Sequence, residues 1–264
     1  MLKIIDHGRI REIRLDRPPA NAINDKLADS LGKALAEAGA TADAVVISGK
    51  PGMFSAGLDV PELIRLDREQ FSSYWHKFLG MLETIARMPV PTAFALTGHA
   101  PAGGIVMALF GDYRIMPRGK FKTGLNEVQV GLVAPPEAHK ALIRLVGAHV
   151  AERILVAGEM MDSQRALEIG LVDELADDPE AVISRAIEWC DQHLRLPRPS
   201  MLQTRSMTRA GLHRIFDDSS EADIEQFVDM WFRESTQNTL GALVEKLDKK
   251  GRTGSRGSDS EAAD

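Results

Sequence analysis

The chain has a single cysteine, Cys190, among its 264 residues and therefore cannot form an internal disulfide. We expect a reducing, cytoplasmic setting in which Cys190, beside Trp189 in an amphipathic stretch, is a buried structural thiol and not a nucleophile. No apolar run approaches the roughly 18 residues that a membrane-spanning helix requires. Residues 1–6 have the features of neither a signal peptide nor a transit peptide, so no membrane contact is expected.

Several catalytic and ligand-binding motifs are also missing. The histidines are scattered without metal-ligand spacing, and no Gly-x-Ser-x-Gly elbow is present to begin a serine-hydrolase triad. The glycine-rich segments match neither a dinucleotide fingerprint nor a phosphate-binding loop. A net charge of −6, with no basic stripe interleaved with aromatics, argues against nucleic-acid binding. We therefore predict no metal and no cofactor.

What the sequence does contain is a succession of short β-branched runs that alternate with helical patterns. Strands are expected at residues 2–6, 10–15, 44–48, 92–97, 113–116 and 171–174. Helices are expected at residues 25–38 (capped by Asn24 or Asp25), 68–88, 102–110, 179–193, 200–214 and 217–249. This alternation of strands and helices predicts an α/β protein with a mostly parallel sheet, followed by a helical carboxy-terminal part. The Gly/Ser-rich segment 251–264 is predicted to be a disordered tail.

The loop Phe54-Ser55-Ala56-Gly57-Leu58-Asp59 follows the predicted strand at residues 44–48. Its small residues let a ligand approach the backbone closely, and the N–H of Leu58, just past Gly57, is a candidate donor. A plain strand-to-helix turn is the alternative interpretation. We predict that Asp59 caps the next helix and does not act as a catalytic acid.

A second loop, Pro101-Ala102-Gly103-Gly104, stands between a predicted strand and a predicted helix. Gly103 can present its N–H at the positive end of that helix, where an oxyanion would be stabilised. Two donors from separate segments are the usual composition of an oxyanion hole. The pair of loops is therefore more informative than either loop alone.

Glu127 is the one carboxylate in the otherwise uncharged run from residue 123 to residue 134. Flanking apolar residues predict a partly desolvated carboxyl with a raised pKa, as a general base requires, although a surface glutamate is the alternative. Two amide donors and one acid/base are the parts of an enzyme that moves a proton beside a thioester carbonyl.

Four ordered motifs resemble those of the crotonase (enoyl-CoA hydratase/isomerase) superfamily over about residues 1–250. They are Arg17-Pro18-Pro19-Ala20-Asn21-Ala22-Ile23-Asn24, the loop 54–59, Pro101-Ala102-Gly103-Gly104, and Ala166-Leu167-Glu168-Ile169-Gly170-Leu171-Val172-Asp173. Within the superfamily, segments 101–104, 111–115 and 124–131 look most like the mitochondrial type of Δ3,Δ2-enoyl-CoA isomerase.

The resemblance implies a spiral core of ββα units over residues 1–195, a helical trimerisation region over residues 196–250, and a homotrimer or dimer of trimers. It implies an acyl-CoA thioester as substrate. It also implies that Leu58 and Gly103 donate the oxyanion-hole hydrogen bonds. The residues implied for substrate and CoA binding are Ala20, Ala22, Ser55, Ala56, Gly57, Asp59 and Gly104.

Hydratases of this superfamily use two glutamates, and the positions that match them here are Val106 and Glu127. Valine cannot orient water or carry its proton, whereas one base suffices to move a proton from C2 to C4. The sequence therefore predicts an isomerase that converts 3-enoyl-CoA to trans-2-enoyl-CoA. Two alternatives remain open. One is hydration or another crotonase reaction, with a second carboxylate from Asp112, Glu62 or Glu137. The other is a non-catalytic acyl-CoA-binding or RNA-binding protein.

Overall fold

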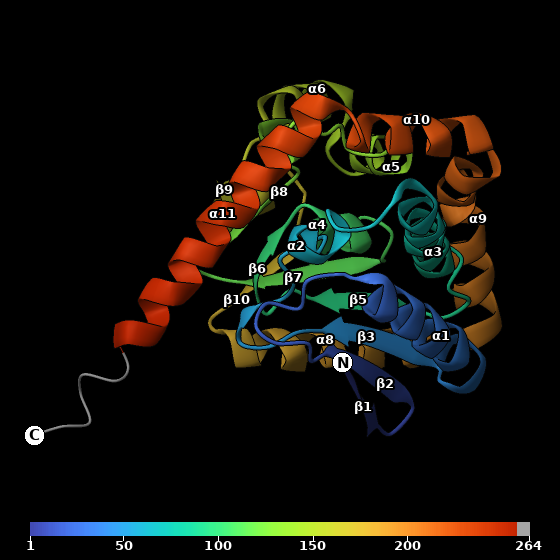
Figure 1. Cartoon of the computed structure of the whole chain (residues 1–264). Coiled ribbons are helices and arrows are strands. Elements are labelled where there is room, and N and C mark those ends of the chain that lie inside the picture. Colours follow the sequence, from blue (N-terminus) through green and yellow to red (C-terminus); the bar gives the residue numbers. More distant parts are fainter. Residues whose placement is uncertain (258–264) are drawn as a thin grey trace, which may run out of the picture.

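The β-branched runs of the sequence form the larger of two sheets in the computed structural model, which describes residues 1–257 (Figure 1). Within the described residues this sheet has six strands in the order β1-β2-β3-β5-β7-β10. The β1–β2 hairpin is antiparallel and the other neighbours are parallel, so the sheet is mostly parallel, as predicted. The strands are β1 (Leu2–His7), β2 (Ile10–Leu15), β3 (Ala44–Ser48), β5 (Thr92–Ala95), β7 (Tyr113–Pro117) and β10 (Glu174–Ala176).

The last of these strands begins at Glu174, three residues later than the sequence predicted. Leu171 and Val172 donate their N–H groups to Ala166 O at 2.9 and 3.2 Å, which completes the end of helix α7 (Ser163–Glu168). Apolar side chains at the end of a helix therefore gave a false strand signal.

A smaller sheet has the order β4-β6-β8-β9 and was not predicted as a sheet. Its strands are β4 (Gly52–Met53), β6 (Gly98–Pro101), β8 (Lys122–Gly124) and β9 (Met161–Asp162). Strands this short do not develop an alternating pattern that the sequence would reveal. They also approach each other very closely, since a Cβ built on Gly98 would lie 2.0 Å from the Gly52 carbonyl carbon.

Helices cover both faces of the larger sheet (Figure 1). Helix α1 (Asp25–Thr41) begins at the Asn24 cap, whose side chain accepts from Leu27 N, and packs with α3 (Arg68–Ala86). Helix α8 (Pro179–Leu194) covers the opposite face and buries Cys190 against the strands, which confirms the predicted buried thiol. Burial raises the pKa of that thiol to about 12, so it is not poised to act as a thiolate.

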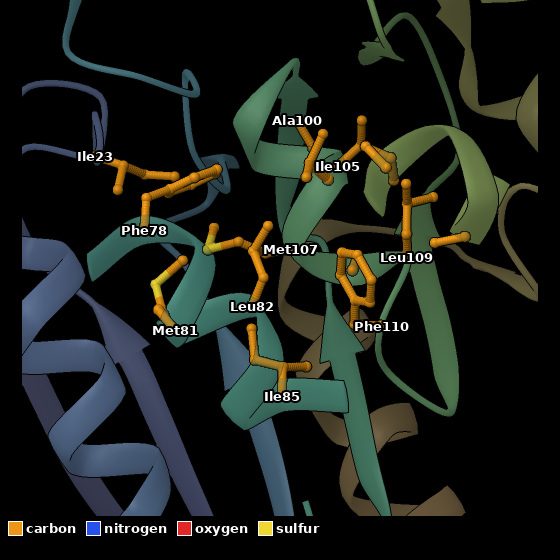
Figure 2. Close-up of a cluster of buried hydrophobic side chains, with 14 of the residues drawn as sticks. Ile23, Phe78, Met81, Leu82, Ile85, Ala100, Ile105, Met107, Leu109 and Phe110 are labelled. Atoms are coloured by element: carbon orange, nitrogen blue, oxygen red, sulfur yellow. The ribbon is translucent and has the colours of Figure 1, made fainter. Parts of the chain in front are cut away.

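Packing in the core fixes the position of one short helix, α4 (Gly103–Ala108). Every residue of α4 is buried, and side chains of α3 such as Leu82 and Ile85 lie beside Met107 and Phe110 (Figure 2). Dense packing of this kind leaves little freedom for a helix to shift. The amino-terminal end of α4, where Gly103 stands, is accordingly fixed by the core.

The carboxy-terminal part consists of α9 (Arg198–Asp217), α10 (Glu221–Trp231) and α11 (Glu234–Gly257). Aromatic rings join α10 to α3: Trp231 stacks on Phe71 with ring centroids 4.2 Å apart. Leu240 of α11 is fully buried in the same chain, whereas Leu247 remains 46% exposed.

Helix α11 continues through residues 251–257, the first part of the segment that we expected to be disordered. Adding a residue to an existing helix requires no new helix nucleus, so a polar segment that follows a helix can continue it. The composition of the segment does not show whether such a helix precedes it. The rest of that predicted tail, residues 258–264, lies outside the described residues. No helix in the described part of the chain is long and apolar enough to cross a membrane.

Candidate active site

The loop between β4 and α2 (Val60–Leu63) is held so that the amide of Leu58 has no partner within the described chain. Gly57 adopts a φ of +83°, a left-handed conformation that glycine accepts without strain. Ile23 N donates to Gly57 O at 2.7 Å, and Asp59 N donates to Ile23 O at 3.1 Å. These bonds lie on either side of Leu58, whose own N–H makes no hydrogen bond among the described residues.

Asn21 supports this loop from the preceding segment. Its side-chain amide donates to Phe54 O at 2.9 Å, and its carbonyl accepts from Ser55 Oγ at 2.8 Å. Ser55 Oγ in turn accepts from Gly57 N at 3.2 Å. Sequence reasoning did not single out Asn21; its φ of +51° is one that asparagine tolerates better than most residues, which was the available signal.

Gly103 lies directly beside this loop. A Cβ built on Gly103 would stand 3.3 Å from Leu58 N, and one built on Gly57 would stand 3.0 Å from Gly103 N. Gly103 is the first residue of α4, where helix geometry leaves the N–H without an intrahelical acceptor. Within residues 1–257 that N–H makes no hydrogen bond. The two amides predicted as donors are thus adjacent and both available.

Glu127 reaches the same edge of the smaller sheet. Strands β6 and β8 are parallel, with Pro101 opposite Gly124, and Ala102 N donates to Gly124 O at 2.8 Å. Gly103 follows the end of β6, and Glu127 follows the end of β8 as the first residue of the 3-10 helix η1 (Glu127–Val130). The carboxyl ends of neighbouring parallel strands therefore bring the base candidate to the side of the oxyanion candidate.

The carboxyl group of Glu127 is desolvated, as its apolar neighbours in the sequence indicated. Its Oε2 atom is buried and has no hydrogen-bond partner among the described residues. Burial raises the pKa of Glu127 from 4.5 to about 7. A carboxyl group with this pKa is half ionised near neutral pH, the condition in which a general base is most effective.

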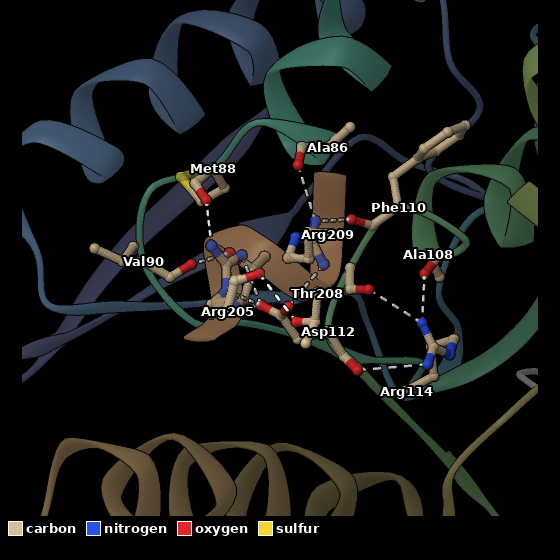
Figure 3. A network of polar contacts seen from close by, with 12 residues as sticks. Ala86, Met88, Val90, Ala108, Phe110, Asp112, Arg114, Arg205, Thr208 and Arg209 are labelled. Atoms are coloured by element: carbon tan, nitrogen blue, oxygen red, sulfur yellow. Dashed lines mark hydrogen bonds and ion pairs between the residues drawn. The ribbon is translucent and has the colours of Figure 1, made fainter. Parts of the chain in front are cut away.

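Val106, the position of the first hydratase glutamate, is buried within α4 and offers no polar atom. Asp112, one of the three alternative carboxylates, is fully occupied elsewhere. It accepts from the guanidinium groups of Arg205 and Arg209 at 2.7–3.0 Å and from Thr92 N at 2.8 Å (Figure 3). This network joins α9 to the core, so Asp112 serves to attach the helical region.

The other two alternatives differ from each other. Glu62 pairs with Arg17 at 3.1 Å and accepts from the Asn24 side chain at 2.9 Å. Glu137, in the first turn of α5 (Pro136–Val146), accepts from Ser219 Oγ with one oxygen, while its other oxygen is buried and has no partner in residues 1–257. Of the three, Glu137 is the carboxylate with an uncommitted oxygen, although it faces the turn between α9 and α10.

The residues implied for CoA binding cluster around the Leu58 loop. Ala56 N donates to Ala20 O at 2.9 Å, and the Ala22 carbonyl accepts from the Arg17 side chain at 2.9 Å. A Cβ on Gly104 would stand 2.6 Å from Ser55 O, which shows how closely α4 approaches the loop.

Asp59 accepts from Glu62 N at 3.1 Å at the start of α2, as predicted for a helix cap. It also pairs with Arg17 at 2.6 Å. The carboxylate is therefore engaged in holding the loop. Across the described residues, no group of three or more His, Cys, Asp or Glu side chains is arranged to hold a metal ion.

A sequence model of the enoyl-CoA hydratase/isomerase family matches residues 6–251. The chain belongs to this family. It is similar to the rat protein "Enoyl-CoA delta isomerase 1, mitochondrial", with 34% identity over 207 residues that cover 78% of this chain and 71% of the relative. It is also 32% identical over 205 residues to a probable enoyl-CoA hydratase of Mycobacterium avium, covering 77% of each chain.

The crystal structure of human mitochondrial Δ3-Δ2-enoyl-CoA isomerase superposes with a TM-score of 0.89 at 27% identity, covering 94% of this chain and 98% of that one. The family resemblance drawn from the sequence motifs is thereby confirmed, as is the crotonase α/β fold with two sheets and carboxy-terminal helices. Membership of this family makes the protein a crotonase-type acyl-CoA enzyme. Because relatives at similar identity are named as isomerase and as hydratase, the family by itself leaves the reaction open.

Proposed function

We propose that this family member is a Δ3,Δ2-enoyl-CoA isomerase, which moves the double bond of a 3-enoyl-CoA to give the trans-2-enoyl-CoA. The observation that supports the proposal is the buried Oε2 atom of Glu127, which has no hydrogen-bond partner among the described residues, together with apolar Val106 at the other hydratase position. One base is what a proton shift within the substrate requires.

In this mechanism the thioester oxygen accepts from the N–H groups of Leu58 and Gly103. Glu127 removes a proton from C2, and the electron pair of that C–H bond forms a C1–C2 double bond while the thioester oxygen takes the negative charge, which gives a dienolate. The protonated Glu127 then returns the proton to C4, which leaves the double bond between C2 and C3. Each oxyanion donor contributes about 3–4 kcal/mol of transition-state stabilisation in enzymes where a donor has been removed.

Hydration is the second candidate, since the Mycobacterium avium relative bears that name and Glu137 has an uncommitted oxygen. Addition of water needs one group to orient the nucleophile and another to return a proton. If Glu137 were that second group, Glu137→Gln would abolish hydration of a trans-2-enoyl-CoA. The isomerase proposal predicts that the same variant keeps its isomerase activity.

The deciding assay follows the absorbance of the conjugated thioester after purified protein is mixed with a trans-3-enoyl-CoA. The proposal predicts rapid conversion by the wild-type protein and loss of turnover in Glu127→Gln, with acyl-CoA binding retained. Conversion that survives in Glu127→Gln would refute the role of this base. Acyl-CoA binding without any conversion by the wild type would favour another crotonase reaction or a non-catalytic binding protein. In a separate gel-shift experiment, a salt-dependent shift of RNA by the protein would favour an RNA binder.

Three further properties belong to the same proposal. Residues 1–195 would form the acyl-CoA-binding core, residues 196–250 would assemble a homotrimer or a dimer of trimers, and the location would be the cytoplasm. The exposed Leu247 and Met207, at 46% and 69%, are apolar side chains that such an assembly would cover. Light scattering of the purified chain gives the subunit number, and fractionation of the source cells gives the location.

A further inference from the structure

One peptide group connects helix α11 to the backbone of Glu127. The hydroxyl of Thr236 donates to Gly131 O at 3.0 Å. Leu132 N, which belongs to the same peptide unit as Gly131 O, donates to Glu127 O at 3.0 Å. Two hydrogen bonds in series through one planar group polarise each other and fix its orientation. The hydroxyl of Thr236 is therefore one peptide unit away from the main chain of Glu127.

The surroundings of this bond are closely fitted. Thr236 is only 2% exposed, in the first turn of α11. Gly131 closes η1 in the left-handed conformation with a φ of +75°, and a Cβ added there would lie 3.6 Å from Thr236 Cα. On the other side, Gln129 Nε2 donates to Gly158 O, at the end of α6 (Ala148–Ala157), at 2.8 Å. The turn that carries Glu127 is clamped between α6 and α11.

The carboxyl group of Glu127 has no comparable bond to another element in the described part of the chain, and the hydrogen bond that it receives comes from the backbone of Glu127 itself. Its Oε2 atom lacks a partner among the described residues, so no hydrogen bond at that oxygen fixes the direction of the side chain. The carboxyl is then located by the backbone of η1 and by packing. A shift of that backbone would displace the carboxyl group from C2, the substrate carbon that it deprotonates in the proposed mechanism.

We propose that Thr236 is a positioning residue for Glu127 and that docking of α11 sets the place of the base through the Gly131–Leu132 peptide. This inference rests on the proposed isomerase function for its kinetic consequence. Its structural consequence, the environment of the Glu127 carboxyl, can be measured without turnover. In the proposed mechanism Thr236 does not touch the substrate.

The test compares Thr236→Val, which removes the hydroxyl and keeps the shape, with Thr236→Ser, which restores the hydroxyl. Thr239→Val is the control on the same helix: the exposed Thr239 also lies next to Gly131, but its hydroxyl donates to Ser235 O within α11, at 2.9 Å, and not to the turn. Each protein is assayed for isomerase kcat and KM, for binding of a saturated acyl-CoA, and for the pKa of Glu127. Carboxyl 13C NMR gives that pKa, with Glu127→Gln to assign the signal.

For Thr236→Val we expect kcat to fall about 10- to 100-fold, the loss that small misplacements of catalytic groups produce, while KM and acyl-CoA binding change less than about twofold. The pKa of Glu127 should fall toward 4.5 as water reaches the loosened turn. Thr236→Ser and Thr239→Val should resemble the wild type. An unchanged kcat and an unchanged Glu127 pKa in Thr236→Val, even with a lower Tm, would overturn the proposal. If the wild type does not isomerise, the proposed function fails, and the Glu127 pKa alone still decides the role of Thr236.

Discussion

Replacing Glu127 by glutamine should make the protein more stable at alkaline pH while it abolishes turnover. Burial raises the pKa of the carboxyl from 4.5 to about 7. Each pKa unit is worth about 1.4 kcal/mol, so the ionised carboxylate reduces the free energy of unfolding by about 3 kcal/mol. Glutamine has nearly the same shape and no charge to desolvate. The variant should therefore gain about 3 kcal/mol where the wild-type carboxylate is ionised.

The sign of the pH dependence follows from proton binding. Between pH 4.5 and 7 the folded wild type holds a proton on Glu127 that the unfolded chain has lost, so its stability decreases as the pH rises through this window. The stability difference between Glu127→Gln and wild type should be near zero below pH 4.5, grow up to about pH 7, and stay constant above it.

Urea unfolding at pH 5, 6, 7 and 8 measures this difference directly. Glu225→Gln is the control, because Glu225 is exposed on α10 and its neutralisation tests the effect of removing one charge. The expected result is a pH-dependent gain for Glu127→Gln that Glu225→Gln does not share. A constant difference from pH 5 to pH 8, or a less stable variant at pH 8, would refute the argument that the ionised Glu127 carboxylate lowers the free energy of unfolding.

Three further outcomes are expected. The kcat/KM of the isomerase should fall about tenfold per pH unit below pH 7, because only ionised Glu127 accepts a proton; a profile that is flat from pH 5 to 7 would exclude Glu127 as the base. Asp112→Asn should cost about 3–5 kcal/mol in urea unfolding, since two poorly exposed arginines lose their shared counter-charge; a loss below about 1 kcal/mol would mean that the network of Figure 3 contributes little. Gly57→Ala should lower kcat/KM about 100-fold or more, because its Cβ would press on Gly103 N at 3.0 Å. Gly8→Ala, at a φ of +66° with no atom of the described residues within 4 Å of the added Cβ, is the control and should keep full activity.

Much of the fold could be predicted from the sequence because short local patterns indicate individual strands and helices. The β-branched run at residues 44–48 became β3, and Asn24 became the cap of α1. The smaller sheet escaped notice because strands such as β4 consist of two residues. Its close contacts depend on residues far apart in the chain, such as Gly52 and Gly98, which no local pattern relates.

The candidate site was partly accessible for the same reason. Glu127 stood out as the one charge in an apolar segment, and the sequence predicted its desolvation from its neighbours. The role of Asp112 was not accessible, because its arginine partners on α9 are more than 90 residues away. The commitment of Glu62 to an ion pair with Arg17, 45 residues earlier in the chain, was likewise not accessible from the sequence.

By itself, the sequence determined which groups are available to this protein: one isolated carboxylate, two glycine-bordered amides and a valine where a second acid would stand. Their chemical character does not depend on the rest of the fold. Only the tertiary structure decided that the Leu58 and Gly103 amides lie together, that Glu127 has a buried oxygen without a partner in the described part of the chain, and that Thr236 of α11 bonds to its turn. These are properties of distance and solvent exclusion between segments that are remote in sequence, and folding alone creates them.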